Sequence, residues 1–252
     1  MSAPGPRRLS VVDPGDVLSG VAPVAFERAS KLCATGDATH RGLLRVAAQI
    51  ADHGLRRIVA PSGRSTLVAG LQAASDWATH DQDLKQVRRQ RSECYSALAA
   101  IEATTLRAVR ASVAAAPERP SSLEAHAETV VWRYLRLAVR LMVEAVVLTL
   151  DGVTTPAQLA AVVQHVAAAR AYQTTALGAA RQPELRLRAE QQATLEAEQL
   201  GDASHAPEVL ALQIFHEYLG VRWKVLHDAE RGYLDEFVSW ALKGSSAPTG
   251  KL

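Results

Sequence analysis

One long apolar stretch dominates this sequence. It extends from Ser121 to Leu150 and reads SSLEAHAETVVWRYLRLAVRLMVEAVVLTL. Apolar residues cover most faces of the helix that this stretch predicts, which is too much apolar surface for a peripheral amphipathic helix. We therefore expect this helix to pass through the middle of the fold.

A single line of charge follows this helix. It consists of Arg133, Arg136, Arg140 and Glu144, and we call it the arginine stripe. Steps of three, four and four residues keep the four side chains on one helix face. Because unpaired ions are costly to bury, the stripe must reach water, face other charged groups or receive a partner.

A second long helix precedes this stretch. No proline or glycine occurs between Asp81 and Ala116, and apolar residues recur there at helical spacing. Pro117 ends this helix, and the connection to the next one is short. So short a connection predicts a long antiparallel hairpin over 81–150, on which the other elements pack.

Capping residues, proline and glycine predict the other helix ends. Asp151-Gly152 ends the apolar helix, and Thr155-Pro156-Ala157-Gln158 begins the next one with a capping box. The remaining expected elements are a short helix near 23–34, a helix from Thr39 that closes at Gly54, a loop over 57–60, a helix from Ser62 or Ser65 past Trp77, an acidic surface helix over 183–201 and an aromatic-rich helical region from 207.

These elements predict an all-α fold, a multi-helix bundle of about seven to nine helices built on the long antiparallel hairpin. We expect residues 1–20 to be an irregular leader and residues 244–252 a disordered tail. Residues 21–243 form a single helical domain in this interpretation. Two helical subdomains that meet near Asp151 are the alternative.

Charge and composition exclude several classes of partner. The 28 basic and 26 acidic residues leave a net charge of +2, which gives no overall field that would attract nucleic acid or an anionic membrane. The charges of the stripe also prevent the most apolar helix from spanning a bilayer. We expect a cytoplasmic protein with no nucleic-acid partner and no membrane partner.

No motif of metal or cofactor chemistry is present. Cys33 and Cys94 are 61 positions apart, and we expect both to be reduced, buried thiols. No two of the eight histidines lie within four residues of each other, so none forms the paired ligands of a helical metal site. We therefore expect no cofactor and no metal, and no residue stands out as catalytic.

The stripe is the candidate binding site, and recognition is favoured over catalysis. We expect a non-catalytic protein–protein interaction module, acting as an adaptor, a scaffold or an inhibitor of the immunity-protein type. An acidic partner protein would bind Arg133, Arg136 and Arg140, because guanidinium groups suit carboxylates. Trp132 would wall the site, and Glu144 would orient Arg140.

The sequence is compatible with three alternatives. In the first, the stripe is structural and lies along a strip open to water or pairs with acids elsewhere in the bundle. In the second, the protein is an enzyme or a small-ligand binder, whose stripe holds a phosphate or carboxylate in a pocket between helices. In the third, the chain is a homo-oligomer.

Overall fold

The computed structural model describes residues 40–80, 84–112, 122–182, 184–200 and 207–242. Within these ranges the fold is all-α, as the sequence predicts, with no strand. Its seven α-helices are α3 (His40–Ile58), α4 (Ser65–His80), α5 (Leu84–Ser112), α6 (Ser122–Leu150), α7 (Pro156–Arg181), α8 (Glu184–Leu200) and α9 (Pro207–Leu242). The expected leader, the helix near 23–34 and the C-terminal tail lie outside the described residues.

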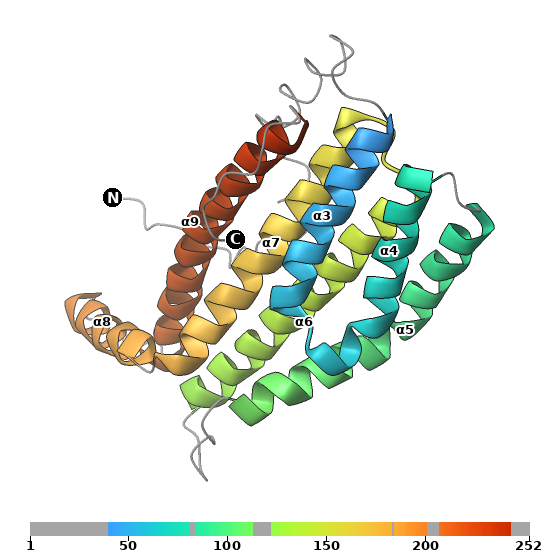
Figure 1. The fold of residues 1–252 in the computed structure, drawn as a ribbon. Helices are drawn as coiled ribbons and strands as arrows, with labels where there is room; N and C mark the ends of the chain where they lie inside the picture. Colours follow the sequence, from blue (N-terminus) through green and yellow to red (C-terminus); the bar gives the residue numbers. More distant parts are fainter. Residues whose placement is uncertain (1–39, 81–83, 113–121, 183, 201–206, 243–252) are drawn as a thin grey trace.

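Helix α6 lies at the centre of the bundle (Figure 1), which confirms the expectation from its apolar surface. Each of the other six described α-helices contacts it. Its most extensive partner is α7, which also packs against α9 and α3. The α5–α6 hairpin as the scaffold of the fold stays a prediction, because the largest helix interface is that between α6 and α7.

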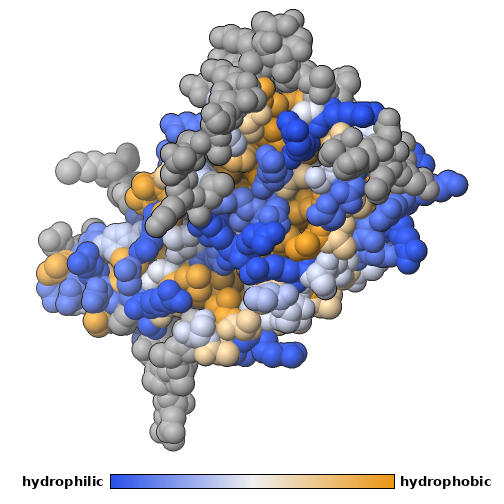
Figure 2. Space-filling model, viewed as in Figure 1, coloured by the Kyte–Doolittle hydropathy of each residue, from blue (hydrophilic) through white to orange (hydrophobic). Residues whose placement is uncertain are grey.

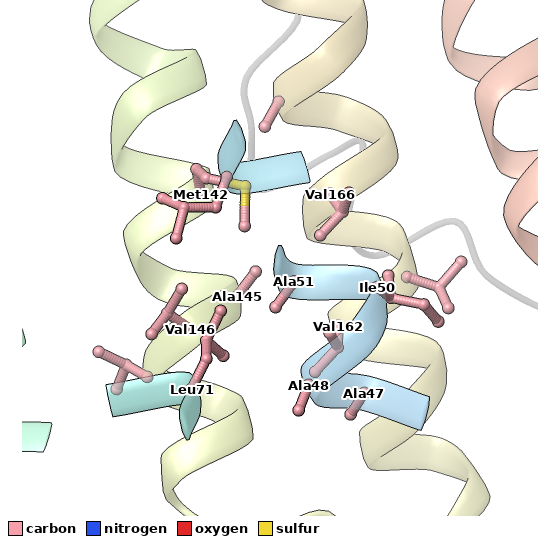
Figure 3. Packing of buried hydrophobic residues seen from close by; sticks show 14 of the residues in the cluster. Ala47, Ala48, Ile50, Ala51, Leu71, Met142, Ala145, Val146, Val162 and Val166 are labelled. Carbon is pink, nitrogen blue, oxygen red and sulfur yellow. The ribbon is translucent and has the colours of Figure 1, made fainter. Parts of the chain in front are cut away.

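Small residues let α3 lie close to both central helices (Figure 3). Ala47, Ala48 and Ala51 of α3 are almost completely buried and lie between α6 and α7. At Gly54, a Cβ atom would lie 2.7 Å from Cγ1 of Val166 on α7. The expected helix end at Gly54 is therefore wrong: α3 continues to Ile58, and the glycine serves helix packing instead of termination.

Long-range hydrogen bonds complete the C-terminus of α3. The carbonyl of Arg57 would normally accept from the N–H of residue 61, but Pro61 has none. Nε2 of Gln173 on α7 donates to this carbonyl instead, at 2.8 Å. The Arg64 guanidinium donates to the carbonyls of Arg56 and Val59, each at 2.7 Å. The last turn of α3 is thereby held to α7.

The start of α7 follows the local rules that predicted it. The Thr155 side chain accepts from the Gln158 N–H, and the Gln158 side chain accepts from the Thr155 N–H, so the capping box is present. Gly152 precedes it with a φ of 94°, in the left-handed region that favours glycine. The expected end of α6 is thus confirmed.

Buried apolar clusters include residues from both sides of Asp151, where two subdomains would meet in the alternative interpretation. The larger cluster of buried apolar residues takes members from α3, α4, α5, α6, α7 and α9. Cys94 of α5 is among them as a free thiol, and burial raises its pKa to about 11. A smaller cluster joins α6 and α7 to α8 and to the first half of α9. Both clusters therefore include residues from before and after Asp151.

Candidate functional site

The arginine stripe lies along an exposed edge of α6. The side chains of Arg136 and Arg140 are 60% and 56% exposed, and Arg133 and Glu144 are also exposed. The other faces of α6 are buried in the two core clusters. The stripe is thus the solvent edge of an otherwise buried helix, and its charges are not desolvated.

Two arginines of the stripe share one acid. Nε of Arg136 lies 3.4 Å from Oε1 of Glu102, and Nε of Arg140 lies 3.2 Å from Oε2 of the same carboxylate. Glu102 comes from α5 and its side chain is only 16% exposed. One negative charge therefore holds two guanidinium groups in place. No described acid pairs with Arg133, which leaves this part of α6 with surplus positive charge.

Glu144 does not orient Arg140 as the sequence predicted. Its carboxylate lies 3.5 Å from Nε2 of His165 on α7. Nδ1 of this histidine lies 2.7 Å from the carbonyl of Ala161, so the ring is held on both sides. Glu144 therefore belongs to the α6–α7 contact, whereas Arg136 and Arg140 belong to the α5–α6 contact.

Trp132 is held at the other end of the stripe. Its indole N–H donates to Oε1 of Glu128 at 3.0 Å. The Arg110 guanidinium of α5 lies 5.1 Å from the centroid of the Trp132 ring and 3.4 Å from the same Glu128 oxygen. This cation–π contact and these polar contacts fix the ring at the surface. Arg110 was not predicted, because only the packing of α5 on α6 brings it to Trp132 and Glu128. Glu128 was not predicted either, although it lies four residues before Trp132 on the same helix.

We define the arginine face as Arg110 of α5 with Trp132, Arg133, Arg136 and Arg140 of α6. Three of its four guanidinium groups pair with only two carboxylates among the described residues, those of Glu102 and Glu128, and Arg133 pairs with no described acid. The structure thus brings together every predicted stripe residue except Glu144, and adds Arg110. The resulting surface is positive, helical and exposed.

A second candidate site, a pocket between α3 and α9, was not predicted. Its volume is about 480 Å³. The described residues that line it are Gln49, Ile50, Asp52, His53, Arg56, Arg57, Tyr233, Leu234, Phe237 and Trp240. On this side of the molecule, hydrophilic side chains lie over the middle of α3, between patches of apolar ones (Figure 2). The spacing of Tyr233, Phe237 and Trp240 was a usable signal, because steps of four and three residues place all three rings on one face.

The charges around this pocket are unevenly paired. Nε of Arg56 lies 2.7 Å from the Asp52 carboxylate, whereas Arg57 is exposed and pairs with no described acid. Burial lowers the pKa of His53 below its ordinary value, and the positive charge of Arg57 lowers it further. The His53 ring lies 5.9 Å from that of Tyr233, and its buried Nε2 has no hydrogen-bond partner among the described residues.

The described residues hold no group of three or more histidine, cysteine or acidic side chains that suits a metal ion. None of the described helices combines the length and apolarity needed to cross a bilayer. Comparison of the chain with protein-family models, with curated proteins and with solved structures found no match.

Proposed function

We propose that this protein is a non-catalytic recognition protein, and that its arginine face binds an acidic surface of another protein. The observation that carries this proposal is the shared carboxylate of Glu102. Arg136 and Arg140 share one carboxylate, and Arg133 pairs with no described acid. The face can therefore bind further carboxylates from a partner. Guanidinium groups on a helix with a buried opposite side also lose little backbone entropy on binding.

The composition of the face supports a protein partner. Arginine and tryptophan are enriched among the residues that contribute most to protein–protein binding. Trp132 is half-buried, and the contacts of its ring with Arg110 and Glu128 preorganise it. The high exposure of Arg136 and Arg140 favours a broad contact surface over a closed small-ligand pocket at the stripe. An adaptor, a scaffold or an inhibitor would each use such a surface.

The experiment is an affinity capture with a charge-matched control. Wild-type protein is compared with the Arg133→Glu, Arg136→Glu double variant of the arginine face. The control is the Arg45→Glu, Arg188→Glu double variant, which changes the net charge equally at exposed positions on α3 and α8. Circular dichroism and thermal melting establish that all three proteins are folded.

We expect a protein that is retained by wild type and by the control variant and is lost from the arginine-face variant. Its affinity, measured with the purified partner, should fall as the salt concentration rises, because the ion pairs are exposed and screened. If both double variants retain the same proteins as wild type, the arginine face is structural and the proposal is wrong.

A further inference from the structure

We propose that the pocket between α3 and α9 binds a small monocarboxylic acid with an aromatic body. This site is distinct from the arginine face on α5 and α6, so the inference does not depend on the proposed function. Its volume of about 480 Å³ falls in the usual range for sites of small molecules.

The apolar part of the pocket suits an aromatic ligand. Ile50 and Leu234 are buried side chains of the lining, and Phe237 and Trp240 are half-buried beside them. The Phe237 and Trp240 rings lie 5.6 Å apart with an interplanar angle of 50°. A flat ring can therefore pack against ring faces and edges of the pocket, as aromatic side chains do in protein cores.

The charge of the pocket suits a single negative charge. Asp52 neutralises Arg56 in an ion pair, which leaves Arg57 as the unpaired cation among the described lining residues. A carboxylate matches the planar guanidinium of Arg57. A phosphate carries more negative charge than this one unpaired guanidinium compensates.

Contacts with α7 hold Arg57 in position. Gln173 donates to the Arg57 carbonyl at 2.8 Å, and its own side-chain oxygen accepts from Nη1 of Arg170 at 3.2 Å. Arg170 in turn lies 3.4 Å from Glu230 of α9. The backbone that carries the unpaired cation is thus fixed relative to both walls of the pocket, which reduces the entropic cost of binding.

A buried polar atom also points to a ligand at this site. Buried polar groups are normally hydrogen-bonded, and each exception needs an explanation. Nε2 of His53, a lining residue, is buried without a partner among the described residues. A ligand carboxyl group in the pocket would supply a hydrogen-bonding partner beside Arg57.

The test uses two nearly isosteric probes, 1-naphthaleneacetate and its uncharged amide, with isothermal titration calorimetry on the full chain. We expect the acid to bind wild type about tenfold more tightly than the amide, because only the acid forms a charged hydrogen-bonded pair with Arg57. Arg57→Gln should remove this preference and retain binding of the amide. Arg45→Gln, at an exposed α3 position outside the lining, should change neither affinity.

A third variant tests the aromatic wall. Tyr233 is 40% exposed, so Tyr233→Ala should leave the fold intact while it weakens both probes by a similar factor. The inference is overturned if neither probe binds, if acid and amide bind wild type equally, or if the preference for the acid survives Arg57→Gln. The Arg133→Glu, Arg136→Glu variant should bind both probes as wild type does, which separates this test from that of the proposed function.

Discussion

Gly54 of α3 lies directly against Val166 of α7. A Cβ atom at position 54 would be 2.7 Å from Cγ1 of Val166 and 2.9 Å from Sδ of Met142. Both distances are shorter than normal van der Waals contact, so a larger residue would push α3 away from the central helices. The close contact of α3 with α6 and α7 at this position thus depends on the absence of a side chain at residue 54.

The first prediction concerns this contact. Gly54→Ala should lower the free energy of unfolding by about 1 kcal/mol. Overpacking destabilises by roughly 1–3 kcal/mol, and the higher helix propensity of alanine offsets about 1 kcal/mol of this loss. Gly232→Ala is the matched control, since a Cβ there would meet nothing within 4 Å. It should raise the free energy of unfolding by about 0.5–1 kcal/mol. Equal effects of the two substitutions in a urea titration would contradict the packing role of Gly54.

The second prediction concerns the acid that two arginines share. Glu102→Gln should lower the free energy of unfolding by at most about 1 kcal/mol, because both arginine partners are largely exposed. It should also tighten binding of an acidic partner and make that binding more sensitive to salt, because two guanidinium groups lose their internal carboxylate. Glu236→Gln removes one exposed acid from α9 and is the control. Weaker binding by Glu102→Gln would argue that Glu102 itself contacts the partner.

The third prediction concerns pH. His227 is buried between α9 and α7, stacks on Trp223 at 4.8 Å and lies 3.1 Å from Nε2 of Gln164. Burial lowers its pKa below the ordinary 6.5, and the positive charge of Arg231 acts in the same direction, while Asp228 opposes both. The unfolded chain therefore binds a proton more readily than the folded one, so the free energy of unfolding falls as the pH falls through 6.5.

This effect can be isolated by comparing variants. His227→Gln should show a smaller loss of stability on acidification, so that the wild-type and variant curves of unfolding free energy against pH converge at low pH. The pKa of His53 is lowered in the same direction, so His53→Gln should act likewise and independently. Its surroundings include Asp52 and Arg57 on α3, Arg170 on α7 and Glu230 on α9. Curves that stay parallel for both variants would refute the assignment.

The fourth prediction concerns the start of α7. Thr155→Ala removes the side chain that accepts from the Gln158 N–H and should cost about 1 kcal/mol of unfolding free energy. Thr155→Ser keeps the hydroxyl and should remain close to wild type. Chemical denaturation of the three proteins measures the difference. Equal stability of all three proteins would show that water replaces the Thr155 hydroxyl as the acceptor with no loss of unfolding free energy.

Much of the helix pattern was predictable because helix ends depend on neighbouring residues. The capping box at Thr155 and Gln158 and the left-handed Gly152 involve contacts within a few positions of the chain. The central position of α6 was also predictable, since a helix that is apolar on most of its faces has to be buried. Local chemistry and hydrophobic periodicity therefore determined the fold class.

Contacts between distant residues set the rest. Gly54 has the features of a helix end in the sequence, yet it lies inside α3, one turn before Ile58, where it packs against Val166 and Met142. Glu102 and Arg140 are 38 residues apart, and only the packing of α5 on α6 brings them together. The pocket joins α3 to α9 in the same way. Sequence periodicity gives the face of a helix on which a side chain lies, whereas the partner of that side chain depends on how the helices pack. In this protein, helix packing determined the charge balance of the arginine face and formed the pocket between α3 and α9.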